Sequence, residues 1–302
     1  TFLSYDDGEG APFEWCQIGT QVDPNTPDTI LVGLAVQARN EGTAIVSFDN
    51  VTVEAPTLDP ASPKALGDPA LDLAFGDAAD LGIVAVGGGA FTPALVEGRL
   101  RVSEEGIGST ATAVWHEAPD AGLAEGFQAE FDAFFTGGVD AADGMTFTAV
   151  SGQDGDWPAD LALSSLVGGA GGALGYQDGS INDRYECHPS FSVELDNWVG
   201  GGNNEPADAG SNVTDFAYHV GVNVGGRTDS VQTNVDFGVG TGALPSLYNA
   251  EGVHFRVVYM PRGLVADLAV YATPNSGGEE IQVIGTQVPT PVSYTHLRAH
   301  ET

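Results

Sequence analysis

The sequence predicts an all-β protein built as a β-sandwich. Short runs of alternating apolar and polar residues recur along the chain, and no long helical periodicity interrupts them. Glycine and proline separate these runs, with 42 Gly and 17 Pro among 302 residues. Alternation with a period of two gives a strand one apolar face, which must be covered by a second sheet. The length is enough for a sizeable core in one or two domains.

The charge balance narrows the class of partners. The chain carries 42 acidic residues against 9 basic ones, a formal net charge of −33, and its single lysine is Lys64. Such a surface repels nucleic acid and anionic membranes, so we expect neither as a partner. The sequence contains no run of 18 or more apolar residues, so no membrane-spanning segment is predicted. A strongly acidic surface suits a salty or calcium-rich exterior, so we expect a secreted or cell-surface protein.

The first part of the chain contains two strand-like runs, 30–36 and 44–53, joined by a turn at 40–43. With its "VGLAV", "GT" and "FDNV" segments, this hairpin resembles the closing strands of bacterial concanavalin-like or jelly-roll modules. The resemblance implies that residues 1–54 are the C-terminal remnant of a preceding β-sandwich. The proline-rich segment 55–69 is predicted to be a linker.

A second domain is expected over residues 70–291. Its clearest strand is 127–135, where alternate residues are Phe or Ala. Cys16 and Cys187 are assigned to different domains, so they define neither a disulfide framework nor a zinc site. The further strand runs are 98–102, 110–115, 145–150, 253–259 and 264–271.

The last residues, 292–302, resemble a translated sequencing adapter. They contain two of the six histidines, in a composition unlike that of the acidic chain before them. We leave them out of the fold prediction. The chain is therefore expected to be a fragment, with its second domain truncated at the C-terminus.

The candidate site lies in the stretch 191–198. Glu194 and Asp196 share one face of the predicted strand, about 7 Å apart, with two aliphatic residues on the other face. Ionised carboxylates this close repel one another unless a cation joins them. His219 opens a second apolar alternation at 220–224. Oxygen ligands with one imidazole suit Ca²⁺ and an ion like Mn²⁺ better than zinc. The alternative is a solvated edge strand and a surface histidine.

Four motifs in one order carry a resemblance to the legume-type (L-type) lectin family. They occupy residues 142–147, 171–176, 193–198 and 219–222, within a region of about 70–288. The glycine-rich motif does not fit a phosphate loop, because no GK[ST] follows it. The resemblance implies a concanavalin A-like jelly roll that binds carbohydrate without changing it.

The resemblance also implies roles for metal-binding residues. Glu194, Asp196 and His219 would hold Mn²⁺ or a similar transition-metal ion, and Asp196 would bridge to Ca²⁺. The backbone carbonyl of Trp198 would be a calcium ligand. The family's calcium asparagine is displaced, because Gly200 stands at its position.

The loop after Gly200 is longer than in the family, so a later asparagine must bind calcium. Asn204 with Asp208 keeps the family spacing and is the favoured pair. The rival residues are Asn203, Glu205 and Asp215.

The resemblance implies three residues that recognise the sugar. Asp143 would accept hydrogen bonds from sugar hydroxyls, the backbone N–H of Gly172 would donate one, and Asn204 would donate another. A carboxylate accepts paired hydroxyls and an amide donates to their oxygens, so this chemistry fits glycans as the partner. Tyr176, Trp157 and Trp198 are candidates for apolar contact with the sugar ring or for the core.

Two other functions compete with the lectin hypothesis. Laminarinase-type glycosidases share the sandwich, and Glu194 and Asp196 match the first half of their catalytic motif. Their acid/base position is Trp198 or Val199 here, neither of which transfers a proton, so no enzyme is expected. A structural or adhesive module with a degenerate sugar site is the other alternative. Sugar specificity and oligomeric state are not predicted.

Three histidines outside the motifs, His116, His188 and His254, have no evident nucleophile beside them. They are interpreted as ordinary surface or half-buried residues.

Overall fold

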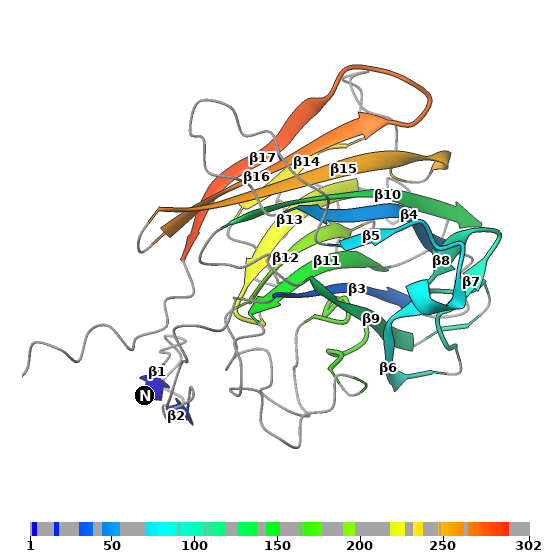
Figure 1. Cartoon of the computed structure of the whole chain (residues 1–302), viewed down its shortest axis with the longest axis horizontal. Coiled ribbons are helices and arrows are strands. Elements are labelled where there is room, and N and C mark those ends of the chain that lie inside the picture. The colour runs from blue at the N-terminus through cyan, green and yellow to red at the C-terminus, as the bar shows by residue number, and fades with distance from the viewer. Residues whose placement is uncertain are drawn as a thin grey trace, which may run out of the picture.

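The structure is a computed structural model, and its description covers the strands and several of their connections (Figure 1). The residues described are 2–4, 15–17, 30–38, 44–54, 71–89, 91–105, 107–108, 110–118, 126–137, 143–151, 164, 166–176, 190–196, 218–226, 232–237, 247, 249–262 and 265–289. The expected linker at 55–69 and the terminal segment 292–302 lie outside these residues.

Two large antiparallel sheets form the protein, which confirms the predicted all-β sandwich (Figure 1). In spatial order, the seven-stranded sheet consists of β14 (Gln232–Phe237), β13 (Tyr218–Val224), β12 (Ser190–Asp196), β11 (Asp143–Ser151), β3 (Ile30–Ala38), β9 (Thr110–Ala118) and β6 (Ile83–Gly88). The eight-stranded sheet runs through β17 (Ile281–Pro289), β16 (Val265–Pro274), β15 (Asn249–Arg262), β10 (Phe127–Gly137), β4 (Ala44–Glu54), β8 (Arg99–Arg101) and β7 (Ala94–Val96), and β5 (Leu71–Leu73) also pairs with β4.

A separate two-stranded sheet pairs β1 (Phe2–Ser4) with β2 (Trp15–Gln17). A 3₁₀ turn, η1 (Ala78–Leu81), follows the N-cap residue Asp77. The Asp77 side chain accepts a hydrogen bond from the backbone N–H of Ala79, as helix N-caps do. Among the described residues, no helix is long and apolar enough to span a bilayer.

A stack of aromatic rings joins the two large sheets. Phe131 of β10 lies against Phe147 of β11, with ring centroids 5.3 Å apart and ring planes 12° from parallel. Phe255 of β15 and Phe48 of β4 contact the same Phe131 ring at centroid distances of 5.6 and 5.9 Å. All four side chains are buried, as the alternation of Phe and Ala in β10 predicts. The sandwich is therefore closed by apolar residues that the strand period places inward.

The two strands expected to close a separate, preceding sandwich belong to this one instead. β3 pairs with β9 and β11 in the middle of the seven-stranded sheet. β4 pairs with β10 and β8 in the eight-stranded sheet. The expected boundary at residue 54 therefore does not divide two sandwiches. Both runs form strands as predicted, but they do not pair with each other as the expected hairpin, because β3 lies in the seven-stranded sheet and β4 in the eight-stranded sheet. Local alternation predicts a strand but does not specify its neighbours.

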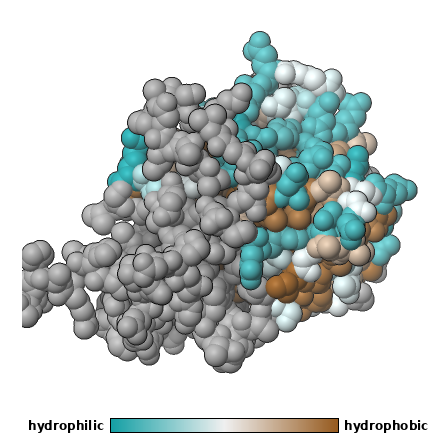
Figure 2. Space-filling view, in the orientation of Figure 1, coloured by the Kyte–Doolittle hydropathy of each residue, from teal (hydrophilic) through white to brown (hydrophobic). Residues whose placement is uncertain are grey.

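Hydrophilic residues gather over the end of the molecule formed by β15, β16 and β17 (Figure 2). Hydrophobic residues gather near the opposite edge, where β6 lies, and two of them, Ile83 and Val86, are exposed. β6 is the last of the described strands in its sheet, so no other described strand pairs with its outer edge.

The position of β4 inside the sandwich is tested by Phe48→Ala. Because Phe48 is fully buried against Phe131, its truncation should cost about 3–5 kcal/mol of unfolding free energy. Urea denaturation should show one cooperative transition shifted to lower denaturant. The matched control Val86→Ala, at an exposed position, should change stability by no more than about 0.5 kcal/mol. An unchanged main transition in Phe48→Ala would mean that β4 is not part of this core.

Candidate functional site

Three of the predicted metal-binding residues lie together on neighbouring strands. Glu194 and Asp196 belong to β12, and His219 belongs to β13. Asp196 is directly opposite His219 across the antiparallel pair, and Glu194 is opposite Gly221. The two carboxylates and the imidazole are 4%, 3% and 1% exposed. The alternative of a solvated edge strand and a surface histidine is therefore wrong for these three residues.

Glu194 has partners on both of its carboxylate oxygens. Its Oε1 lies 3.4 Å from His219 Nε2, and its Oε2 accepts a hydrogen bond of 2.6 Å from Asn223 Nδ2. We call Glu194, Asp196, His219 and Asn223 the acidic cluster. Asn223 is not among the residues predicted from the sequence, although it lies four residues after His219 and therefore shares its face of the strand.

Asp143, the predicted sugar acceptor, lies on β11, the strand that pairs with β12. It is the first residue of β11 and is buried. The next residue, Gly144, is opposite Asp196. A Cβ atom at Gly144 would lie only 2.9 Å from the Asp196 Cα, so a larger residue would push the two strands apart. This glycine therefore lets the strand bearing Asp143 approach the strand bearing Asp196 closely.

The glycine-rich segment 166–176 carries Gly172, the predicted amide donor. Gly172 is exposed, whereas Leu174 and Tyr176 are fully buried. The segment folds back on itself, since the N–H of Gly175 donates to the carbonyl of Gly169 at 3.1 Å. Leu174 has a left-handed backbone with φ of 48°. The result is a compact turn whose apolar side chains face the protein and whose tip is open to solvent.

Side chains of the seven-stranded sheet hold this turn in place. Trp115 Nε1 donates a 2.7 Å hydrogen bond to the carbonyl of Leu166, and Thr146 Oγ1 donates one of 3.5 Å to the carbonyl of Leu174. Thr146 is opposite Glu194 in the sheet. The turn bearing Gly172 is thus attached to the strand next to the acidic cluster. Tyr176, an aromatic candidate for sugar contact, instead packs in a buried cluster with Trp115.

The remaining predicted site residues lie outside the described part of the chain. They are Trp198, Asn204 and Asp208, the rival residues Asn203, Glu205 and Asp215, and the aromatic candidate Trp157. Within the described ranges, no group of three or more His, Cys, Asp or Glu side chains is arranged to hold a metal ion. The carboxylates and imidazole of the acidic cluster are nevertheless ligand types that a Mn²⁺-like ion takes, and Ca²⁺ takes the carboxylates.

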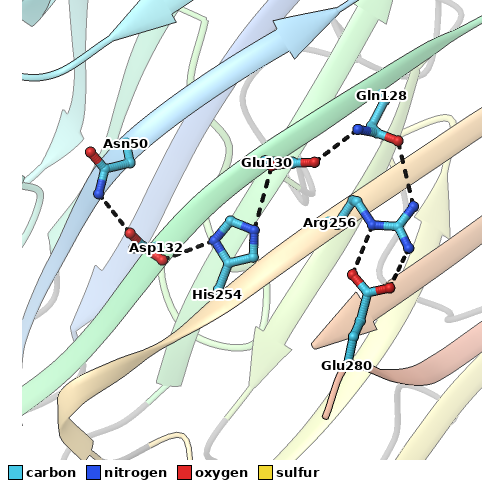
Figure 3. Close-up of polar contacts among 7 residues, drawn as sticks. All are labelled: Asn50, Gln128, Glu130, Asp132, His254, Arg256 and Glu280. Atoms are coloured by element: carbon cyan, nitrogen blue, oxygen red, sulfur yellow. Dashed lines mark hydrogen bonds and ion pairs between the residues drawn. The ribbon is translucent and has the colours of Figure 1, made fainter. Parts of the chain in front are cut away.

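A second polar cluster, which was not predicted from the sequence, lies on the outer face of the eight-stranded sheet (Figure 3). His254 of β15 is half-buried, as expected, but lies between two carboxylates of β10. Its Nδ1 is 3.0 Å from Asp132 Oδ1, and its Nε2 is 3.6 Å from Glu130 Oε2. Asn50 of β4 donates a 2.7 Å hydrogen bond to Asp132 Oδ2. We call these residues, with Gln128, Arg256 and Glu280, the outer-face network.

The network continues from Glu130 across β15. Gln128 Nε2 donates to Glu130 Oε1 at 2.8 Å, and Arg256 Nη1 donates to Gln128 Oε1 at 3.5 Å. Arg256 Nε donates to Glu280 Oε1 at 2.8 Å. The guanidinium also lies over the Tyr271 ring, 4.0 Å from its centroid. Period-two alternation could have placed these side chains on one face, but only the strand register brings them opposite one another.

Electrostatic shifts in the network follow from these contacts. Hydrogen bonds to Asp132 and then Glu130 raise the pKa of His254 from 6.5 to about 9, against the opposing effect of burial. For Asp132 burial alone raises the pKa, but hydrogen bonds from His254 and Asn50 outweigh it and lower the pKa. The raised pKa keeps His254 an imidazolium at neutral pH, so that one positive charge lies between two carboxylates.

No family model matches this chain, and neither a curated protein nor a solved structure matches it.

The charge state of His254 predicts a pH dependence of stability. Above 6.5 the folded state retains a proton that the unfolded state releases, so unfolding free energy should fall as pH rises toward about 9. We expect His254→Gln to remove this dependence. The difference in unfolding free energy between the parent protein and the variant should decrease by about 1 kcal/mol between pH 6.5 and about 9, a value reduced for solvent screening. Urea titrations at a series of pH values measure it.

His116 provides the matched control for this experiment. Burial lowers the pKa of His116 to about 4, so its titration contributes below 6.5 and not above it. His116→Gln should therefore retain the loss of stability between pH 6.5 and 9. A constant difference between the parent protein and His254→Gln over that range would contradict the assignment.

Proposed function

We propose that the chain is a non-catalytic, metal-dependent carbohydrate-binding module of a secreted or cell-surface protein. The observation that carries this proposal is the acidic cluster, in which a buried carboxylate–imidazole contact joins Glu194 to His219 and Asp196 lies opposite His219. In the proposed site, Glu194, Asp196 and His219 hold a Mn²⁺-like ion. Asp196 also contributes to a calcium site.

The physical support for a metal ion is the cost of burying charge. Glu194 and Asp196 are both almost fully buried on one face of β12, only two residues apart. Ionised carboxylates out of water are strongly unfavourable unless opposite charge compensates them. A divalent cation supplies such compensation and orders the chain around it. The calcium ligands proposed from the sequence are the Trp198 carbonyl, Asn204 and Asp208.

Sugar binding is proposed at the rim formed by Asp143 and the glycine-rich turn. The Asp143 carboxylate accepts hydrogen bonds from paired hydroxyls, and the Gly172 N–H and Asn204 amide donate to sugar oxygens. Two contacts support this arrangement. Gly144 keeps the strand of Asp143 close to Asp196, and Thr146 joins the turn of Gly172 to β11. Preorganised polar groups of this kind reduce the entropy lost on binding.

Binding without catalysis is proposed because no second proton-transferring carboxyl follows Asp196 in the strand pattern. Positions 198 and 199 are Trp and Val. Retaining hydrolysis needs two carboxyl groups about 5–5.5 Å apart, one of which transfers a proton. Release of reducing sugar from β-glucans, lost in Glu194→Gln, would replace this proposal with a glycosidase.

Metal binding is tested by thermal and chemical denaturation with Mn²⁺ and Ca²⁺ after chelation. An ion at 100 times its Kd should raise the unfolding free energy of the parent protein by about 2.7 kcal/mol. Asp196→Asn should lose most of this increment, because its carboxylate is proposed to contact both ions. Glu279→Gln removes one negative charge at an exposed position and should retain the full increment.

Glycan binding is tested on an array of oligosaccharides, with and without chelator. The proposal expects binding that chelator abolishes and that Asp143→Asn lowers strongly without removing the metal increment. Metal-dependent stability without binding to any glycan would support the structural or adhesive module instead. The absence of any metal increment in the parent protein would contradict both.

A further inference from the structure

The hydroxyl group of Tyr176 connects the glycine-rich turn to the two strands of the acidic cluster. Tyr176 ends the turn, and its Oη lies 2.9 Å from Ser190 Oγ at the start of β12. The backbone N–H of Gly226, just beyond β13, donates to the same oxygen at 2.9 Å. The N–H of Gly225 donates to the Ser190 carbonyl at 3.0 Å, which ties these two strand ends together.

We propose that Tyr176 is a positioning residue whose hydroxyl fixes the Gly172 turn in the orientation required for ligand binding. This inference rests on the proposed function, because it concerns the same site. Ser190 begins the strand that carries Glu194 and Asp196, and Gly226 follows the strand that carries His219. The hydroxyl thus connects the turn to both strands at the ends away from the acidic residues.

The surroundings of Tyr176 make its hydroxyl an effective anchor. The side chain is fully buried and packs in a cluster with Trp115 and Leu166. Burial raises the pKa of Tyr176 to about 12, so the group remains a neutral donor and acceptor under ordinary conditions. A neutral hydroxyl can accept the Gly226 N–H while it exchanges a hydrogen bond with Ser190. Removing this oxygen would leave a buried N–H without its acceptor.

The other two side-chain hydrogen bonds to the turn are either longer or farther from Gly172 along the chain. The Thr146 hydrogen bond to Leu174 is long, at 3.5 Å, and the Trp115 bond is at Leu166, six residues before Gly172. The Tyr176 hydroxyl is therefore the short side-chain contact nearest to Gly172 among those described. Its loss should free the turn while the sandwich remains closed.

Tyr259 offers a matched control for the same chemical change. It is another fully buried tyrosine, on β15, and its hydroxyl has no hydrogen-bond partner among the described residues. Tyr176→Phe and Tyr259→Phe each remove one buried oxygen and keep the aromatic ring. Only the first breaks hydrogen bonds, so any difference between the two variants reports on those bonds.

The experiment compares the parent chain and both variants by amide hydrogen exchange and by ligand binding. Tyr176→Phe should raise exchange about tenfold at the amides of 169–176, with no change in β15 and β16. Binding to an array of neutral oligosaccharides should weaken by about tenfold, since a smaller fraction of the molecules has a competent turn. Mn²⁺ affinity should stay unchanged, and Tyr259→Phe should behave like the parent chain.

Two results would overturn the inference. One is unchanged exchange in the turn of Tyr176→Phe, and the other is an equal loss of Mn²⁺ and sugar affinity, which indicates a general structural effect. If the parent chain binds no oligosaccharide, the proposed function fails. The hydrogen-exchange comparison still decides whether the hydroxyl fixes the turn.

Discussion

Contact between the two sheets through Phe131 and Phe147 is the constraint on which the rest of the structure depends. Once the alternating residues of β10 and β11 face each other, every strand beside them must present the same parity to the core. Val193 and Leu195 are buried in that core. Glu194 and Asp196 must therefore lie on the opposite face of β12. Apolar packing thus decides where the charged residues gather.

The two polar clusters use the same strand geometry but differ in how their charge is compensated. In the outer-face network, His254 and Arg256 supply positive charge to carboxylates that remain partly open to solvent. In the acidic cluster, Glu194 contacts an imidazole and a neutral amide while it is almost fully buried. Buried carboxylates require more compensation than exposed ones. This difference is the reason why we propose an ion at the acidic cluster and not at the outer-face network.

The glycine-rich turn shows how a polar rim can be held above a closed sandwich. Its buried residues, Leu174 and Tyr176, anchor it, while Gly172 stays exposed. Backbone groups at such a tip can approach a ligand without interference from a side chain. The anchoring contacts reach the strands on both sides of Glu194. A shift of those strands can therefore move the turn through the hydrogen bonds of the Tyr176 hydroxyl.

Sequence alone determined the all-β class, the inward faces of the strands and the common face of Glu194 and Asp196, because each follows from a period of two residues. The tertiary structure decided which strands are neighbours. It placed β3 and β4 inside the sandwich, His219 opposite Asp196, and Asn223 against Glu194. It also placed His254 between the carboxylates of Asp132 and Glu130. Local alternation fixes the face on which a residue lies, but only long-range strand pairing and register fix what lies across from it.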